Sequence, residues 1–184
     1  MAHYELHTSQ LREYVNRLKA GDTVSLTGTV YTSRDAAHKR IMASLEQGET
    51  LPYDLQDSVV YYAGPTPAKP GQVIGSCGPT TAGRMDPFSP TMIANGQVCM
   101  IGKGVRSKEV HDAMKQHGCV YMIAIGGAGA IIAASVKQLE VVAYEDLGCE
   151  SVKKLTVENF PAIVAMDTAG GSLYETGKEQ FRQE

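Results

Sequence analysis

The stretch Cys119-Val120-Tyr121-Met122-Ile123-Ala124-Ile125 decides the fold class. It is a short, near-continuous apolar run, which is typical of a strand buried on both faces of a parallel sheet. The small residues of 128–137 predict a helix after it. Before it, Ser107 is placed to cap a helix that carries Val110 and Met114. A buried strand between two helices is the repeating unit of an α/β protein.

The rest of the chain continues this alternation. Helices are expected over 11–18, after Arg34-Asp35 and in the tail beyond 177, whereas His3 and His7 are expected in a frayed end. The early part holds more strands than a simple doubly wound sheet needs, so we expect an α/β domain with a layered β/β/α arrangement. The expected strands are 24–30, 59–62, 73–74, 98–101, 141–144 and 162–166.

The composition is that of one globular domain. The 184 residues include 43% apolar and 20% charged residues and carry a formal net charge of −3, so we expect a single domain over 1–184. With no basic run, nucleic acid is not an expected partner. The longest apolar stretch, 120–134, is interrupted by three glycines. It is unsuited to crossing a membrane, which takes about 20 apolar residues.

The cysteines indicate a reducing compartment. Cys77, Cys99, Cys119 and Cys149 are spaced too widely for a zinc site or an iron–sulfur cluster. We therefore expect no metal site built by this chain alone. The first residues show neither the basic start nor the apolar core of an export signal. A cytoplasmic protein with free thiols is expected.

Three polar segments place cations beside glycines or at the start of a helix. They are 32–40, 78–86 and 102–104, and they contribute Arg34, Arg84 and Lys103. Each also has a plainer interpretation as a helix start, a solvated face or a turn. Arginine binds carboxylates in a bidentate way and lysine acts as a point charge, so three converging cations would suit a small dianion. The sequence alone does not show that they converge.

A fourth segment, Gly126-Gly127-Ala128-Gly129-Ala130, superficially suggests a dinucleotide-binding loop. Its spacing is not G-x-G-x-x-G, and no acidic residue closes a matching unit downstream. Close packing of a helix on a strand explains these glycines better.

The ordered motifs resemble a known family. Thr32–Arg40, Leu51–Leu55, Gly78–Asp86 and Ile101–Gly104 are similar to motifs in the β subunit of iron–sulfur-dependent class I fumarases and of the related L-tartrate dehydratases. The resemblance covers residues 21–174 and also fits the C-terminal domain of single-chain enzymes. It implies a swivelling β/β/α domain. It also implies a [4Fe–4S] cluster held by a separate α subunit, in an α₂β₂ assembly.

The resemblance also implies roles for residues of this chain. Arg34 matches the family's carboxylate-binding arginine, and Thr80 matches the threonine proposed as its catalytic base. A threonine hydroxyl is a poor base unless nearby cations lower its pKa. The implied substrate-binding set is Arg34, Thr80, Thr81, Ala82, Gly83, Arg84 and Lys103.

The implied reaction is the reversible hydration of fumarate to L-malate. L-Tartrate or another β-hydroxy dicarboxylate is the alternative substrate. The similarity of Arg34–His38 and Gly126–Gly129 to fumarases favours fumarate. An alternative of another class is a non-catalytic domain that binds dicarboxylates. Exposed apolar residues beside the site, covered in the complex, would be expected of a subunit that completes its site with a partner.

Overall fold

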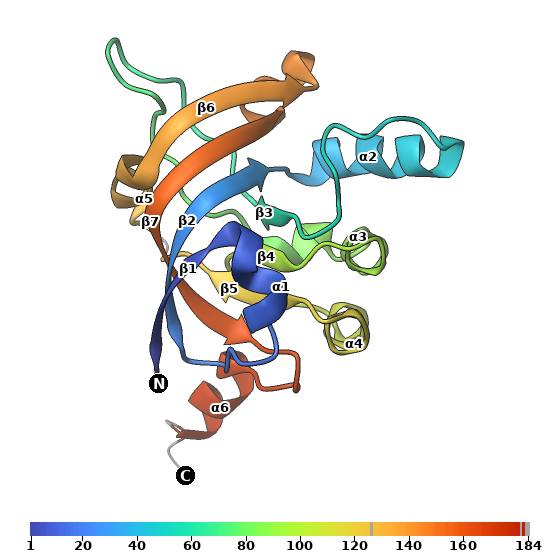
Figure 1. Cartoon of the computed structure of the whole chain (residues 1–184), viewed down its shortest axis with the longest axis vertical. Helices are drawn as coiled ribbons and strands as arrows, with labels where there is room; N and C mark the ends of the chain where they lie inside the picture. Colours follow the sequence, from blue (N-terminus) through green and yellow to red (C-terminus); the bar gives the residue numbers. More distant parts are fainter. Residues whose placement is uncertain (126, 181, 183–184) are drawn as a thin grey trace.

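The computed structural model describes residues 1–125, 127–180 and 182. Its sheet closes on itself, because β2 pairs with β7 as well as with β3 (Figure 1). β1 (His3–His7) pairs with β2, and β6 (Val136–Ala143) pairs with β7, so these two strands extend the closed part. The strands of the closed part are β2 (Thr23–Thr32), β3 (Val59–Tyr61), β4 (Cys99–Gly102), β5 (Val120–Ile123) and β7 (Val152–Met166).

Two long strands make the closure possible. β2 has 10 residues and β7 has 15, and they pair antiparallel along nearly their whole length. The last residues of β7 also pair with β5, while its first half pairs with β6. Between the pairs Leu26–Phe160 and Gly28–Val157, β7 has one residue more than β2, which marks a bulge in β7, and bulges bend a strand and increase its twist. The expected α/β class is confirmed, with a closed, barrel-like sheet.

The strands from β1 to β5 run parallel to one another. Their carboxyl ends therefore meet on one side, which we call the carboxyl edge: the loops that follow Thr32, Tyr61, Gly102 and Ile123. The opposite side, where β2 to β5 begin, is the amino edge. Parallel α/β sheets bind their ligands outside the carboxyl ends of the strands, so the carboxyl edge is the place to look for a site.

The helices cover the sheet on two sides (Figure 1). One core cluster joins the sheet to α1 and α5, and a second joins it to α2, α3 and α4. Within β3, Tyr61 belongs to the first cluster and Val60 to the second, as expected when successive residues of a strand face opposite sides. The helices are α1 (Leu11–Tyr14), α2 (Asp35–Gln47), α3 (Ser89–Ala94), α4 (Lys108–His117), α5 (Gly129–Ser135) and α6 (Leu173–Gln180), and the 3₁₀ turns are η1 (Thr8–Gln10), η2 (Ala82–Met85) and η3 (Glu145–Glu150).

The structure corrects several local predictions. The helix expected over 11–18 ends at Tyr14, and the strand expected over 162–166 begins ten residues earlier, at Val152. The N-terminal residues form β1 rather than a frayed end, because Leu6 is buried in the core when the segment pairs with β2. Residues 73–74 lie in a loop and not in a strand. The helix expected over 128–137 ends at Ser135, where β6 begins. No helix in the described part of the chain combines the length and the apolar character needed to span a bilayer.

Candidate active site at the carboxyl edge

Backbone hydrogen bonds bring two of the predicted segments together. The Thr80 carbonyl accepts from the Lys103 N–H at 3.2 Å, and the Ala82 N–H donates to the Lys103 carbonyl at 2.8 Å. Thr81 and Lys103 consequently pair as a short parallel bridge. The loop 78–81 and the turn that follows β4 thus form one unit at the carboxyl edge. The structure therefore places two of the three cation-bearing segments side by side.

Gly102 is required for this close approach. A Cβ atom at Gly102 would lie 2.9 Å from Tyr62 Cδ2 and 3.1 Å from the Ala82 Cβ. Any larger residue would push the two loops apart, because contacts below 3.0 Å force a neighbour to move.

Thr80 is held at its backbone and at its side chain by the same acceptor. Its N–H donates to the Tyr62 carbonyl at 2.8 Å, and its Oγ1 hydroxyl donates to that carbonyl at 3.0 Å. The side chain is half-buried. Because the hydroxyl proton is engaged, the oxygen lone pairs are the part of the group left for a ligand.

Arg34 lies at the neighbouring strand exit, at the N-cap of α2. Its side chain is 17% exposed, and Nη2 pairs with Glu150 Oε1 at 3.1 Å. Nε is buried without a hydrogen-bond partner and lies 3.8 Å from Asp35 Oδ1. A buried N–H of a guanidinium that lacks an acceptor is costly, and a ligand is one physical explanation for it.

The remaining predicted residues differ in exposure. Ala82 is buried, whereas Thr81, Gly83, Arg84 and Lys103 are exposed. Within the described residues, neither Arg84 nor Lys103 forms an ion pair. The structure therefore brings Thr80, Thr81, Ala82 and Lys103 together directly. Gly83 and Arg84 follow in η2, and Arg34 lies at the next strand exit.

His38 differs from the solvated residue that its charged neighbours suggested. It is fully buried, and its Nδ1 lies 2.9 Å from both the Ser33 hydroxyl and the Arg34 carbonyl. Burial lowers the pKa of His38 from 6.5 to about 4, so the ring is neutral at pH 7. Since a carbonyl only accepts, Nδ1 carries the proton and fixes the backbone of Arg34.

Sequence reasoning missed two charged residues at this edge. Glu150, from η3, pairs with Arg34. Arg106 is buried and pairs with Asp86, the last residue of the 78–86 segment. The sequence did contain a signal for this pair. Arg106 lies four residues after Gly102, and the 78–86 segment ends in an aspartate, a residue of opposite charge.

The chain's own donors do not fit a metal cluster. Cys77, Cys99 and Cys119 are buried free thiols, and Cys149 is an exposed one. Across residues 1–125, 127–180 and 182, no group of three His, Cys, Asp or Glu residues is placed to hold a metal ion.

Gly129 allows close packing, but against a loop and not against the strand that was expected for the glycine-rich segment. A Cβ at Gly129 would lie 2.4 Å from Ser76 Oγ and 3.1 Å from the Gly78 nitrogen. The start of α5 therefore packs directly on the loop that precedes Thr80. Gly126 lies outside the described residues.

Comparisons with known proteins agree with this geometry. The family model described as Fumarase C-terminus matches residues 1–177. The chain is 39% identical over 169 residues to a class I aerobic fumarate hydratase of Salmonella typhimurium, covering 91% of this chain and 29% of that protein. It is 41% identical to fumarate hydratase 2 of Leishmania major, again covering 29% of the relative. The chain thus spans less than a third of these relatives.

A third relative has a length close to that of this chain. A putative L(+)-tartrate dehydratase subunit beta of Methanocaldococcus jannaschii is 42% identical over 167 residues, which cover 88% of this chain and 86% of the relative. These matches confirm the resemblance that the sequence motifs indicated. The chain therefore belongs to the Fumarase C-terminus family.

Proposed function

We propose that this chain is the β subunit of a heteromeric fumarate hydratase, which interconverts fumarate and L-malate. The observation that carries the proposal is the pairing of Thr81 with Lys103. That bridge places a lysine, two threonine hydroxyls and the turn bearing Arg84 at the carboxyl edge, next to the strand exit that bears Arg34. A dicarboxylate needs cations at both of its ends, and this edge supplies three.

The cations bind and polarise the substrate in this proposal. Arg34 and Arg84 provide guanidinium forks for carboxylates, and Lys103 provides a compact charge. Removing a proton from the carbon next to a carboxylate builds negative charge on that carboxylate. Fixed cations in a site closed from water stabilise such charge. Thr81, Ala82 and Gly83 line the same loop and complete the proposed substrate-binding set.

Thr80 is the proposed base of the malate-to-fumarate direction. Its hydroxyl is fixed by the Tyr62 carbonyl at 3.0 Å, beside the backbone of Lys103. The Tyr62 carbonyl accepts the hydroxyl proton and therefore stabilises the neutral hydroxyl. To act as a base, Thr80 must first lose this proton to solvent, and the cations of the site must stabilise the resulting alkoxide, because an opposite charge favours an anion. Thr80→Ser is expected to retain turnover, whereas Thr80→Ala is expected to lose it.

The proposal assigns the [4Fe–4S] cluster to an α subunit. Among residues 1–125, 127–180 and 182, no three His, Cys, Asp or Glu side chains are placed together to hold a metal ion. Val105 and Ile125, which follow the glycine turn and β5, are exposed by 57% and 59%, and exposed apolar residues beside a site are typical of a protein interface. We propose an α₂β₂ assembly in which the partner covers them.

The proposal also covers the domain organisation of this chain and its location in the cell. We propose that it is a single domain over 1–184 with the swivelling β/β/α arrangement. The two core clusters on either side of the sheet support layers of that kind. The cysteines are free thiols, which supports a cytoplasmic location.

A second candidate is the β subunit of an L-tartrate dehydratase. One observation favours it: the relative of matching length is named as such a subunit. Both substrates are four-carbon dicarboxylates, so the same cations serve either reaction.

The test is anaerobic reconstitution with a cluster-bearing α subunit, with fumarate and L-tartrate run in parallel. The expected result is turnover of fumarate that requires both chains. Turnover of tartrate alone would transfer the assignment to the second candidate. Dicarboxylate binding without turnover, with a partner whose cluster is intact, would identify a non-catalytic binding domain.

A further inference from the structure

Arg106 is a buried cation between β4 and α4. Its side chain is 0% exposed, and its Nε donates to Asp86 Oδ1 at 2.6 Å. Nη2 donates to Ser89 Oγ at 2.6 Å, and Nη1 lies 3.0 Å from the sulfur of Met100. Each of the three guanidinium nitrogens therefore has a partner inside the protein, and the side chain is closed off from solvent.

Two aromatic rings enclose the same guanidinium. Its Cζ lies 5.4 Å from the centre of the Tyr62 ring and 5.1 Å from that of Tyr121. Both distances are within the range of cation–π attraction. Tyr62 is also the residue whose carbonyl fixes Thr80. Arg106 thus packs against the residue that holds the proposed base.

Asp86 connects Arg106 to the two loops that carry the free cations. Its Oδ2 accepts from the Ser107 N–H at 2.7 Å, and its own N–H donates to the Gly83 carbonyl at 3.3 Å. Asp86 ends the turn that bears Arg84. Arg106 ends the turn that bears Lys103. The ion pair is therefore a cross-link between these two turns, in addition to the Thr81–Lys103 bridge.

A buried ion pair is a costly way to fill a core. Well-packed apolar residues of similar volume often stabilise a protein as well or better, because two charges must lose their water. A directional, three-partner contact has a different property: it allows only one orientation of the groups that it joins. That property matters where a site depends on the angle between two loops.

We propose that Arg106 is a positioning residue that holds the Arg84 and Lys103 turns in the orientation that presents both cations to one dicarboxylate. The identity of the ligand, a dicarboxylate, rests on the proposed function. The loop geometry stands independently of it. Arg106 acts through Asp86 and does not touch the substrate.

The experiment compares Arg106→Met with Arg12→Met in the full chain. Arg12 is the control, because its Nε also donates to an aspartate, Asp57, at 2.6 Å, but at the amino edge and with a side chain that is 33% exposed. Hydrogen exchange of the Thr80, Ala82 and Lys103 amides reports the loop geometry, and the Val164 amide, bonded to the Asp22 carbonyl, reports global stability. Fumarate affinity of the chain and KM of the reconstituted enzyme report function. Asp86→Asn and Arg106→Lys are milder variants in case Arg106→Met does not fold.

We expect Arg106→Met to speed exchange of the three loop amides at least tenfold more than exchange at Val164, and to raise KM for fumarate at least tenfold. A merely structural role would lower the yield of folded enzyme and leave KM unchanged, as we expect for Arg12→Met. Arg106→Lys is expected to restore part of the affinity, since it keeps a charge beside Asp86.

Two results would overturn the inference. One is unchanged protection of the loop amides. The other is loosened loops with an affinity within twofold of the wild-type chain. If the wild-type chain shows neither binding nor turnover, the proposed function fails, and the exchange data alone decide whether Arg106 orders the loops.

Discussion

Except for the buried Arg106–Asp86 pair at the carboxyl edge, the charged residues at the two edges of the parallel strands differ in how many of their hydrogen bonds are already made. At the amino edge, Arg12 donates to Asp57 and to the carbonyls of Gly96, His117 and Gly118. At the carboxyl edge, Arg34 keeps a buried Nε without an acceptor. Arg84 and Lys103 form no ion pair within the described residues.

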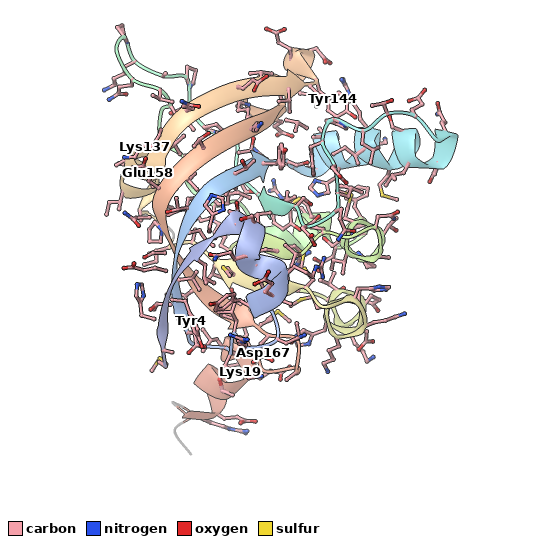
Figure 2. The ribbon with its side chains drawn as sticks, viewed as in Figure 1. Tyr4, Lys19, Lys137, Tyr144, Glu158 and Asp167 are labelled. Carbon is pink, nitrogen blue, oxygen red and sulfur yellow. The ribbon has the colours of Figure 1, made fainter. Side chains whose placement is uncertain are left out.

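The carboxylates of the amino edge also accept hydrogen bonds from within the protein. Asp167 accepts from three backbone N–H groups, those of Ala20, Ala169 and Gly171, and Figure 2 shows Lys19 beside it. Asp22 accepts from the Ala2 and Lys19 amides. The comparison teaches that residue type does not distinguish a site from a structural contact. The distinction lies in whether the charged group's hydrogen bonds are already used.

The largest effect is expected from removing a free cation. Arg84→Ala or Lys103→Ala is expected to lower kcat/KM of the reconstituted enzyme by about 10²–10³-fold, the usual loss for one stabilising donor. Because both side chains are exposed, thermal unfolding should move little. Arg12→Ala is expected to do the reverse, with a loss of roughly 2 kcal/mol in stability and unchanged activity per folded molecule. Equal kinetic losses at both edges would contradict the comparison.

The two edges should lose stability in different pH ranges. The pKa of His38 is lowered to about 4 by burial, against an opposing contribution from its bond to the Arg34 carbonyl, and Arg106 and Asp35 are the charged groups that face it. Between about pH 6.5 and 4 the unfolded chain binds the extra proton, so stability falls as pH falls, by about 3 kcal/mol in all.

Asp167 responds at lower pH. Burial raises its pKa, but the backbone N–H donors outweigh that effect and lower the pKa below its ordinary value. Its contribution to the free energy of unfolding is therefore present above about pH 4 and lost as the pH falls further. Urea unfolding should be measured at a series of pH values. We expect His38→Gln to flatten the dependence of stability on pH between about 6.5 and 4 only, and Asp167→Asn to change it only below about pH 4. A His38→Gln profile identical to the wild type would show that His38 does not titrate in this way.

A smaller effect is expected from adding one methyl group at each edge. Gly102→Ala should cost about 1–3 kcal/mol, because the new atom would lie 2.9 Å from Tyr62, and it should raise KM. Gly118→Ala at the amino edge adopts a strained φ of +69°, which costs about 1–2 kcal/mol, with KM unchanged. Calorimetry and initial rates separate the two. An unchanged KM for Gly102→Ala would indicate that loop spacing is unimportant.

The smallest effect concerns the carboxylate that competes for Arg34. Glu150→Gln should remove the negative charge that lies 3.1 Å from Nη2 while keeping an amide oxygen that can still accept. It should tighten fumarate binding about threefold, the size of a single ion pair. Asp57→Asn, the amino-edge counterpart, should leave binding unchanged. Weaker binding by Glu150→Gln in a calorimetric titration would mean that Glu150 orients Arg34 instead of competing for it.

Local patterns predicted the parts of the site that follow apolar strands. The strands before Arg34 and Lys103 are evident from their apolar residues, so both cations could be placed at strand exits. Closure of the sheet could not be predicted, because the pairing of Thr23–Thr32 with residues of Val152–Met166 joins segments more than a hundred residues apart, and register between distant strands leaves no local signal. Arg106 was missed for the same reason. Its partner Asp86 is 20 residues away, and a buried ion pair looks like surface charge in a sequence.

The most direct test of a ligand site at the carboxyl edge is amide chemical-shift mapping of the full chain during titration with fumarate, L-malate and L-tartrate. The account predicts shifts concentrated at Thr80–Arg84, Gly102–Gly104 and Ser33–Asp35, and lost in Lys103→Ala. Shifts concentrated around Arg12, Asp22 and Asp167, or an unchanged response in Lys103→Ala, would contradict it.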